Sequence, residues 1–391
     1  MTSKNIRVCA FSYYFPPHFS GAGFYALTLA KEFAKKDIPF TFVTVDNTGL
    51  PRHDIYQGFD IYRVADGPKK HGEFVLWWNL SRTFHLIRGQ FDIIHAFGST
   101  YKNSAVGPIA KLLGKKSLTT VSMANNDLHP ITARSVAGRV QACFLRQVDR
   151  YISLSRQISE EIKTLPLDPR KAVEIPQGVD HHRFRPASET EKSDLRLQLH
   201  LPNGQLALYV GVFDGRKNVK WLVETWTKYR DRFSDWHLIL VGPSSRDRRD
   251  AELRDNLRKL VHENGLVERI LFRDFCPTIE DYYRAADIFI LPSQNEGMPN
   301  VVVEAMASGL PCVVTLISGT TDLIEHGRSG MLFEVNSEAS FLAAMEPIAQ
   351  EQKTRLCIGA RARRFVLQRF STETVVERYL EVYREMLGGQ N

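Results

Sequence analysis

The sequence predicts an α/β protein made of two doubly wound domains. Its 391 residues are too many for one ordinary hydrophobic core and fit two domains of roughly 180 to 200 residues each. Short apolar runs of strand length alternate with helical segments, most regularly between Leu206 and Val314. We therefore expect a first domain over residues 1–182, a second over 183–371 and a final helical segment over 372–391.

In the first half, a helix is expected over residues 23–35, and an aromatic-rich helix over 73–89, with a polar stretch from Asp46 to Arg63 between them. The apolar runs predict strands at Ile6–Ser12, Phe40–Val45, Phe91–Phe97, Ser117–Val121 and Tyr151–Leu154. The aromatic residues of the second helix either pack onto the sheet or, with nearby cations, dock at a membrane interface. The residues concerned are Trp77, Trp78, Phe84, Lys70, Arg82 and Arg88.

In the second half, strands and helices alternate. The predicted strands are Leu206–Val212, Trp236–Val241, Arg269–Phe272, Ile288–Leu291 and Pro311–Val314. Amphipathic helices are expected at Ala339–Glu351, Lys353–Gln368 and Thr372–Met386.

Composition and charge narrow the class of protein. The five cysteines are scattered and odd in number, which favours reduced thiols in a cytoplasmic protein and neither a disulfide framework nor a metal site. The N-terminus lacks the apolar core of a signal peptide, and no apolar run approaches the ~20 residues that span a bilayer.

The net charge of +7 is unevenly distributed along the chain. Residues 1–182 carry 23 Lys and Arg against 15 Asp and Glu, whereas the remainder is nearly neutral. Such a field favours an anionic partner, which could be a lipid phosphate, a membrane surface or an acidic glycan, unless the imbalance is only a solvated surface. No basic stripe interleaved with stacking aromatic residues is present, so we expect no nucleic-acid partner.

Two carboxylates form the most informative pattern in the chain. Glu296 lies in a loop after the apolar run Asp287–Leu291, and Glu304 lies in the helix that Pro299 is expected to begin. They can be on the order of 10 Å apart. Carboxylates only accept hydrogen bonds, so the pair suits hydroxyls at the two ends of one small ligand. The alternative is an ordinary surface Glu beside a helix-interior Glu.

The stretch around this pair reads Ser-x-x-Glu-Gly-Met-Pro-Asn-Val-Val-Val-Glu-Ala-Met-Ala-Ser-Gly-Leu-Pro and resembles the signature of retaining glycosyltransferases of family 4. The family has the GT-B fold, so the resemblance implies two Rossmann-like domains facing each other across a cleft. It covers nearly the whole chain, most specifically residues 206–330. By the same analogy, the segment 372–391 crosses back to the N-terminal domain, and Ile175–Asp180 resembles the family's hinge.

The resemblance assigns the donor site mainly to the second domain. Arg216 and Lys217 follow a predicted strand and suit a diphosphate, Arg by bidentate bonding and Lys as a point charge. It implies that Glu296 holds the hydroxyls of the donor sugar, that Glu304 holds those of the ribose, and that the loop of Phe275 faces the base. The other residues expected to contact the donor are Gly21, Gly23, Gly297, Met298, Pro299, Asn300, Gly319 and Thr320.

In the first domain the candidates are His95 and Asp127. His95 ends a predicted strand, where open α/β sheets bind ligands. The family's histidine at this place reaches the donor sugar or the reaction centre, but Phe97 replaces the second histidine of the usual His-x-His run. Asp127, in an Asn- and Asp-rich loop, is the candidate general base. A core histidine and an ordinary turn are the alternatives.

A dinucleotide-binding protein is a rival interpretation. Gly21 to Ala26 fits the dinucleotide fingerprint, and Asp46 stands where a ribose-binding acid would lie. However, eight residues with two prolines separate this Gly from the first strand, whereas the fingerprint Gly comes directly after its strand.

The sequence therefore predicts a retaining, metal-independent glycosyltransferase. We expect it to move a hexose-type sugar from a UDP or GDP donor to the hydroxyl of a glycan or lipid-linked acceptor, without a cofactor. We expect it in the cytoplasm, where the N-terminal domain could contact the inner face of an anionic membrane. The alternatives are a non-catalytic nucleotide-sugar-binding subunit and a nicotinamide-dependent dehydrogenase.

Overall fold

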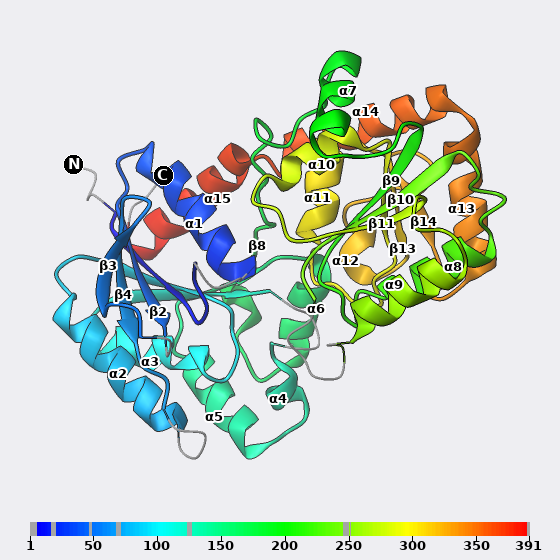
Figure 1. The fold of residues 1–391 in the computed structure, drawn as a ribbon. Coiled ribbons are helices and arrows are strands. Elements are labelled where there is room, and N and C mark those ends of the chain that lie inside the picture. The colour runs from blue at the N-terminus through cyan, green and yellow to red at the C-terminus, as the bar shows by residue number, and fades with distance from the viewer. Residues whose placement is uncertain are drawn as a thin grey trace. The chain divides into compact units, whose positions relative to one another are not determined.

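The computed structural model describes residues 6–16, 21–46, 49–67, 72–122, 127–244, 250 and 252–388 (Figure 1). Contacts within the chain divide it into two compact units. Unit 1 comprises residues 1–178 and 372–391, and unit 2 comprises Val179–Ser371. The first division falls a few residues before the boundary expected from the sequence. Each unit is an α/β layer structure built on a largely parallel sheet.

Unit 1 contains an eight-stranded sheet in the order β3-β4-β2-β1-β5-β6-β7-β8. The central strands β1, β2 and β5 are buried along their whole length, as parallel strands covered on both faces must be. β3 pairs antiparallel with β4, and the other described pairs are parallel. The strands are β1 (Val8–Ser12), β2 (Phe40–Val45), β3 (His53–Tyr56), β4 (Phe59–Val64), β5 (Ile93–Phe97), β6 (Lys116–Val121), β7 (Arg150–Ser153) and β8 (Ala172–Glu174).

Helices cover both faces of this sheet. On one face α1 (Gly21–Ala34) lies beside α15 (Thr372–Met386), so the end of the chain packs into unit 1 (Figure 1). On the other face α2 (Gly72–Leu86) and α3 (Val106–Leu112) share a second core cluster. The remaining described helices of unit 1 are η1 (Asn103–Ala105), α4 (His129–Thr132), α5 (Val136–Leu145), α6 (Arg156–Thr164) and η2 (Pro169–Lys171).

The stretch from Asp46 to Arg63, read from the sequence as merely polar, contains a β-hairpin. β3 and β4 are joined by Gln57 and Gly58, both with positive φ, of 51° and 88°. Two consecutive left-handed residues are typical of the tight turn that suits the twist of paired strands. β3 is an exposed edge strand, and β4 extends the parallel sheet beside β2. The apolar alternation in this hairpin is weak, which explains why the sequence pattern did not predict it.

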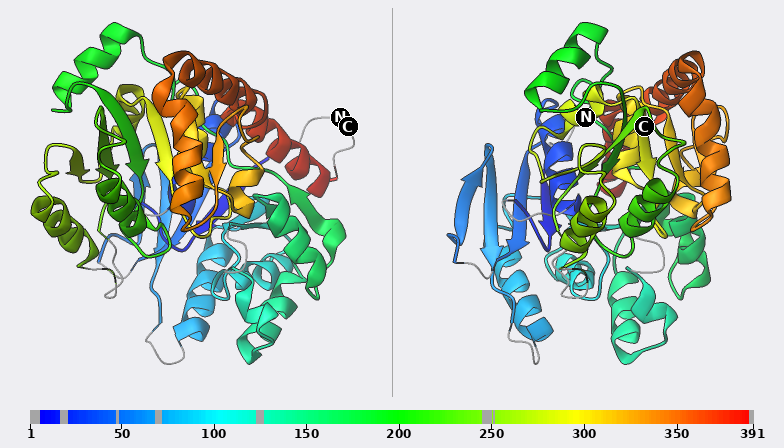
Figure 2. Two further views of the ribbon diagram at one scale, coloured as in Figure 1. Left: turned by 90° about the vertical axis from the view of Figure 1, so that its right-hand side faces the viewer. Right: turned by 45° about the vertical axis from the view of Figure 1, so that its right-hand side comes forward.

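Unit 2 contains a six-stranded parallel sheet in the order β11-β10-β9-β12-β13-β14. The strands are β9 (Gln205–Val210), β10 (Trp236–Val241), β11 (Ile270–Arg273), β12 (Ile288–Leu291), β13 (Cys312–Thr315) and β14 (Met331–Phe333). The sequence analysis predicted all but β14. The helices are α7 (Glu189–Gln198), α8 (Val219–Lys228), α9 (Leu253–Glu263), α10 (Ile279–Ala285), α11 (Asn300–Ala307), α12 (Ser318–Thr321), α13 (Glu338–Gln350) and α14 (Gln352–Arg369). α13 packs against β13 and β14, and α14 against α11 (Figure 2).

The strand orders define a switch point in each sheet. From β1 the chain goes to β2 on one side and later to β5 on the other, and from β9 it goes to β10 and later to β12. In open α/β sheets, ligands bind outside the carboxyl ends of the strands at such a point. Two loop regions are therefore the candidate ligand edges. One follows β1 and β5 in unit 1, and the other follows β9 and β12 in unit 2.

Among the helices of the described part of the chain, none is long and apolar enough to cross a lipid bilayer.

Candidate active site

The loops that follow β9 and β12 are tied together at the switch point of unit 2. The backbone N–H of Gln294 donates to the carbonyl of Arg216 over 2.9 Å, and the Arg216 guanidinium donates to the carbonyl of Asn295 over 3.1 Å. These bonds fix both loops at the carboxyl ends of neighbouring strands. The adjacent residues of the two loops therefore point their side chains into one small region.

Glu296 lies between the two cations of this region. Its Oε1 accepts from the Lys217 Nζ at 2.6 Å, and its Oε2 accepts from the Arg216 Nη1 at 3.0 Å. Burial by itself would raise the pKa of this carboxyl, but Lys217 and Arg216 outweigh it, and the pKa lies below its ordinary value. Glu296 is therefore an anion held by two cations, so the three groups together carry one positive charge.

The turn that presents these cations is held by its own polar groups. The Asp214 Oδ1 accepts from the backbone N–H of Lys217 at 2.7 Å. Asn218 has a left-handed backbone with φ of 57°, and its amide donates to Asn336 and accepts from Gln294. Asn tolerates this conformation better than most residues. Asp214 and Asn218 were not among the residues predicted from the sequence. The available signals were an Asp-Gly pair before two cations and an Asn after them.

Glu304 lies on α11, and its Oε2 accepts from the Tyr283 hydroxyl at 2.9 Å. Burial raises the pKa of Glu304, while the Tyr283 hydrogen bond and the nearby Arg183 partly offset that rise. Tyr283 lies on α10 and is itself fully buried. Glu304 is thus held in a fixed orientation, and Tyr283 is a supporting residue that sequence reasoning missed.

The ends of α11 differ slightly from the expectation. Pro299 is the N-cap residue and Asn300 begins the helix, whereas the sequence suggested Pro299 as its first residue. At the other end Gly309 has φ of 78°, its N–H donates to Met306, and the N–H of Leu310 donates to Ala305. This is the glycine-based closure that ends many helices. Gly297, Met298 and Pro299, which join the Glu296 loop to α11, are buried.

The short helix α12 lies against the Glu296 loop. A Cβ atom on Gly319 would be 2.6 Å from the Glu296 carbonyl oxygen and 2.7 Å from that of Gly297, so no larger residue fits there. Thr320 is fully buried, and its hydroxyl donates to the Thr315 carbonyl at 2.6 Å. Gly319 is therefore close to the candidate donor site, whereas the Thr320 side chain serves the fold.

Phe275 follows β11, which is separated from β9 by β10 in the sheet. Its side chain is half exposed on the same carboxyl edge as the Glu296 region. Phe275 therefore lies at the side of the site.

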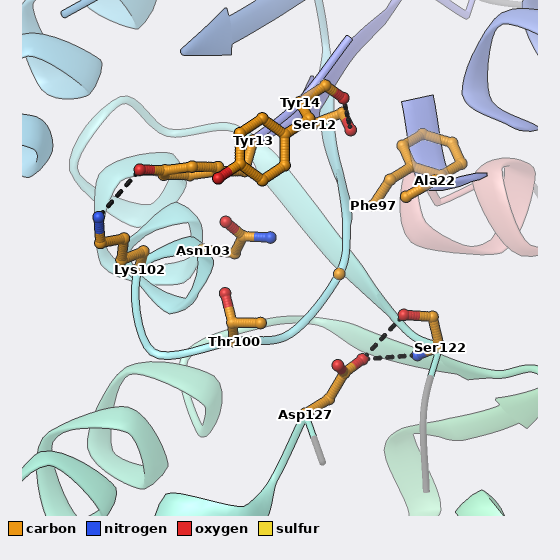
Figure 3. A pocket seen from close by; sticks show the side chains of 11 residues that line it. Ser12, Tyr13, Tyr14, Ala22, Phe97, Thr100, Lys102, Asn103, Ser122 and Asp127 are labelled. Carbon is orange, nitrogen blue, oxygen red and sulfur yellow. Dashed lines mark hydrogen bonds between the residues drawn. The ribbon is translucent and has the colours of Figure 1, made fainter. Parts of the chain in front are cut away.

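Unit 1 has a pocket of about 370 Å³ at the β1–β5 switch point. Its walls come from the loops that follow β1, β5 and β6, together with the first turn of α1 (Figure 3). The lining residues are Ser12, Tyr13, Tyr14, Ala22, Phe97, Gly98, Thr100, Lys102, Asn103, Ser122 and Asp127. The predicted candidate Asp127 is among them.

Two polar groups give this pocket its chemistry. Asp127 Oδ2 accepts from the backbone N–H of Ser122 at 2.8 Å and from the Ser122 hydroxyl at 2.9 Å, which fixes the carboxyl group (Figure 3). Asn103 is 4% exposed, and its Oδ1 has no hydrogen-bond partner among the described residues. Figure 3 shows its amide directed toward the middle of the pocket. A buried amide oxygen of this kind is normally satisfied, so it is suited to accept from a ligand.

A charged cluster borders the same pocket. The Lys102 Nζ donates to Asp66 Oδ2 at 2.7 Å and to the Tyr13 hydroxyl at 2.9 Å, and that hydroxyl in turn donates to Asp66. Burial would lower the pKa of Lys102, but the bonds to Asp66 and Tyr13 raise it above its ordinary value. The cluster is absent from the sequence predictions because its members are far apart in the chain.

His95 is placed differently from the expectation. Its side chain is fully buried in unit 1, with Nδ1 hydrogen-bonded to the Tyr383 hydroxyl and Nε2 to the Thr120 hydroxyl, each at 2.8 Å. Burial lowers the pKa of His95 to about 3, so the ring is neutral. In this structure His95 joins β5 to β6 and α15, and it is not among the lining residues of the pocket. A direct role at the reaction centre stays a prediction.

Gly21 and Gly23 lie in the first turn of α1, where Ala22 between them lines the unit 1 pocket. β1 ends at Ser12, well before Gly21, so neither glycine forms a tight turn directly after the strand. The geometry that a dinucleotide fingerprint requires is therefore not present here.

These observations define the class of protein. It has two doubly wound α/β units, and the ligand edge of unit 2 carries two cations around a buried carboxylate. Two family models match the chain, "Glycosyltransferase Family 4" over residues 19–183 and "Glycosyl transferases group 1" over residues 204–351. The chain belongs to this family of glycosyltransferases.

Curated relatives agree with this assignment. The Escherichia coli UDP-Gal:alpha-D-GlcNAc-diphosphoundecaprenol alpha-1,3-galactosyltransferase is 28% identical over 77% of this chain and 77% of its own. A D-inositol 3-phosphate glycosyltransferase of Thermomonospora curvata is 25% identical over 93% of this chain and 90% of its own.

Solved structures share the fold. Sucrose-phosphate synthase from Thermosynechococcus elongatus superimposes with a TM-score of 0.81 at 21% identity, covering 98% of this chain and 99% of the other. HepE of Anabaena, in complex with UDP and glucose, gives 0.80 at 18% identity, covering 96% and 99%. The protein thus has the GT-B fold that the sequence predicted, with two α/β domains built on parallel sheets.

Proposed function

We propose that the protein transfers a hexose-type sugar from a UDP or GDP donor to an acceptor hydroxyl, with retention of configuration at the anomeric carbon. The observation that carries the proposal is the position of Glu296 between Arg216 and Lys217 at the ligand edge of unit 2. A nucleotide sugar offers an anionic diphosphate beside neutral hydroxyls. The site offers two cations that suit the diphosphate, beside a carboxylate that can accept hydrogen bonds from the hydroxyls.

The cations are the groups that would lower the barrier. When the bond from the sugar to the diphosphate breaks, negative charge builds on the leaving phosphate oxygen. Arg216 can bind that group through two N–H donors and Lys217 through a point charge, without being reorganised during the reaction. Lys217 is held by both Glu296 and the Asp214 turn, so its charge is already in position. Glu296 would then accept hydrogen bonds from the sugar hydroxyls and orient the anomeric carbon.

The other donor contacts follow from the same edge of the sheet. Glu304, oriented by Tyr283, would accept from the two ribose hydroxyls. The loop of Phe275, two strands from β9, would lie against the base. Gly319 keeps α12 close to Glu296, so its place supports a close approach to the diphosphate.

The unit 1 pocket is the proposed acceptor site. Asn103 and Asp127 offer acceptor oxygens that suit sugar hydroxyls, and the aromatic rings of Tyr13, Tyr14 and Phe97 suit the apolar face of a sugar. Asp127 is also the proposed general base if the leaving phosphate does not itself take the proton. A glycan or lipid-linked acceptor is supported by the Escherichia coli relative, whose name specifies a diphosphoundecaprenol-linked sugar.

No divalent metal is part of the proposal. Arg216 and Lys217 supply the positive charge that would face the diphosphate, and Glu296 accepts from both cations. We further propose that the protein works in the cytoplasm, at the inner face of the membrane. Neither a cofactor nor a nucleic acid takes part in the proposal.

The test is a transfer assay with a panel of UDP- and GDP-sugars and glycan acceptors, in which the anomeric configuration of the product is read by NMR. Retained configuration in a product formed without added metal is expected. An inverted product would overturn the retaining mechanism. If donors bind and stabilise the protein by mass action but no acceptor or water is ever glycosylated, the non-catalytic binding subunit becomes the better account. Two findings argue against the dehydrogenase alternative: Gly21 does not directly follow β1, and the chain belongs to a glycosyltransferase family.

A further inference from the structure

One helix of unit 1 presents an apolar stripe to the solvent. α2 buries Leu76, Leu80 and Phe84 completely against the sheet. On its opposite side Phe74, Trp78 and Leu86 are 65%, 71% and 76% exposed. These positions follow four-residue steps, with Arg82 completing the series, so they form one inclined ridge on the helix surface.

The stripe is fixed in place rather than left loose. The Phe74 ring contacts the Trp77 ring edge-on at 5.6 Å, and Trp77 in turn contacts Tyr101 and Phe144. The Trp77 indole N–H donates to the Lys102 carbonyl at 3.2 Å. Trp77 therefore anchors the helix, and its neighbours Phe74 and Trp78 face outward. From the sequence, the aromatic residues of this helix could either pack onto the sheet or dock at a membrane interface. In the structure Phe84 lies in the core and Trp78 lies on the surface.

The charged groups beside the stripe are mostly basic, and the exception is Glu73 in the first turn of α2. Arg82 and Arg88 are exposed beside it, and the sequence from Phe74 to Phe91 contains no Asp or Glu. Unit 1 as a whole holds 25 Lys and Arg against 18 Asp and Glu, so it accounts for the entire net charge of +7. Isolated exposed apolar residues are common on protein surfaces and carry no meaning alone. An aligned apolar stripe with Arg residues and a Trp is typical of helices that lie in a membrane interface.

We propose that the outward face of α2, formed by Phe74, Trp78, Arg82 and Leu86, together with Arg88 just beyond the helix, docks the protein onto an anionic lipid bilayer. The aromatic and Leu side chains would enter the boundary between headgroups and acyl chains. The two Arg side chains would contact lipid phosphates, which is the charge complementarity that selects a membrane over a neutral apolar partner. This inference rests on the proposed function in one respect, the lipid-linked acceptor. The α2 surface would bring the enzyme to the membrane that holds this acceptor.

The test is vesicle flotation of the full-length protein without donor or acceptor, so that its outcome does not depend on transferase activity. Vesicles of phosphatidylcholine alone are compared with vesicles that contain phosphatidylglycerol. We expect binding to the anionic vesicles, reduced at least tenfold in Phe74→Ser/Trp78→Ser and about tenfold in Arg82→Gln/Arg88→Gln. Matched controls in unit 2 are Leu197→Ser, at 73% exposed, and exposed Arg361→Gln, which should bind as the wild type does.

Equal binding by wild type and the α2 variants would overturn the proposal, as would wild type that ignores anionic vesicles. A concentration-dependent dimer that only Phe74→Ser/Trp78→Ser abolishes, with no vesicle binding, would assign the stripe to a second copy of the chain instead. Transfer to a water-soluble acceptor should be unchanged in the α2 variants. If soluble transfer fails in wild type while vesicle binding follows the pattern above, the proposed function fails and the docking surface stands.

Discussion

The Nζ of Lys217 lies 2.6 Å from the Oε1 of Glu296, although the two residues are 79 positions apart in the chain. The contact exists because β9 and β12 are neighbours in the sheet of unit 2 and both end at the same edge. This contact holds the positive charge of Lys217 in place before a ligand binds.

Replacing Lys217 by Met should lower turnover strongly. The substitution keeps the length of the side chain and removes the charge that would meet the leaving diphosphate, so we expect kcat to fall by on the order of 10²-fold or more. Lys220→Met, exposed in the first turn of α8 just after Lys217, is the control and should leave the steady-state constants close to wild type. Similar kcat values in both variants would remove Lys217 from the mechanism.

Replacing Glu304 by Ala should act mainly on donor binding. Loss of the acceptor for two hydroxyls is expected to raise donor KM roughly 10- to 100-fold, with a smaller change in kcat. Tyr283→Phe, which removes only the hydroxyl that orients Glu304, should raise donor KM less. A Glu304→Ala enzyme with an unchanged donor KM would show that the ribose is held elsewhere.

The pocket of unit 1 should control the acceptor and leave the donor unaffected. Asn103→Leu removes the unsatisfied amide oxygen, so we expect kcat/KM for the acceptor to fall about tenfold. Asp127→Asn should lower it further if this carboxylate accepts the proton. Donor affinity, measured by thermal shift with the nucleotide sugar alone, should match wild type in both variants, and a parallel loss of donor binding would count against the assignment.

His95 gives the protein an acid-sensitive element. Its pKa is about 3 in the folded state and about 6.5 in an unfolded chain, so the unfolded chain binds more protons between these values. This contribution to stability is complete above pH 6.5 and falls by roughly 1.4 kcal/mol per pH unit below it. Wild type should therefore lose Tm between pH 6.5 and pH 5 more steeply than His95→Gln. Exposed His262→Gln should follow the wild-type slope, and parallel slopes for all three would contradict the assignment.

The sequence predicted those features whose chemistry is local. The stretch from Glu296 to Glu304 carries its turn, helix start and carboxylates within nine residues, and the pair Arg216-Lys217 lies in the turn after a strong apolar strand. The main strands were found because buried parallel strands are continuous apolar runs. The hairpin β3–β4 was missed because an edge strand needs no such run.

Features that depend on distant neighbours could not be predicted from the pattern alone. His95 is a core residue because α15, almost 300 residues later, places Tyr383 against it. Asn103 has an unsatisfied oxygen only because the loops after β1 and β5 enclose it, and Tyr283 matters only through its bond to Glu304. In each case the residue type is common, and tertiary packing decides its role.

Calorimetric titration tests most directly whether Glu296, Arg216 and Lys217 together hold a nucleotide sugar. Wild type, Glu296→Gln and Arg216→Ala/Lys217→Ala would each be titrated with UDP, GDP and their hexose derivatives. We predict that wild type binds one family of these compounds and that the double variant binds them at least tenfold more weakly. Glu296→Gln should retain the nucleoside diphosphate but gain nothing from the attached sugar. Heats showing that wild type takes up none of these compounds, or that all three proteins bind them equally well, would contradict the account.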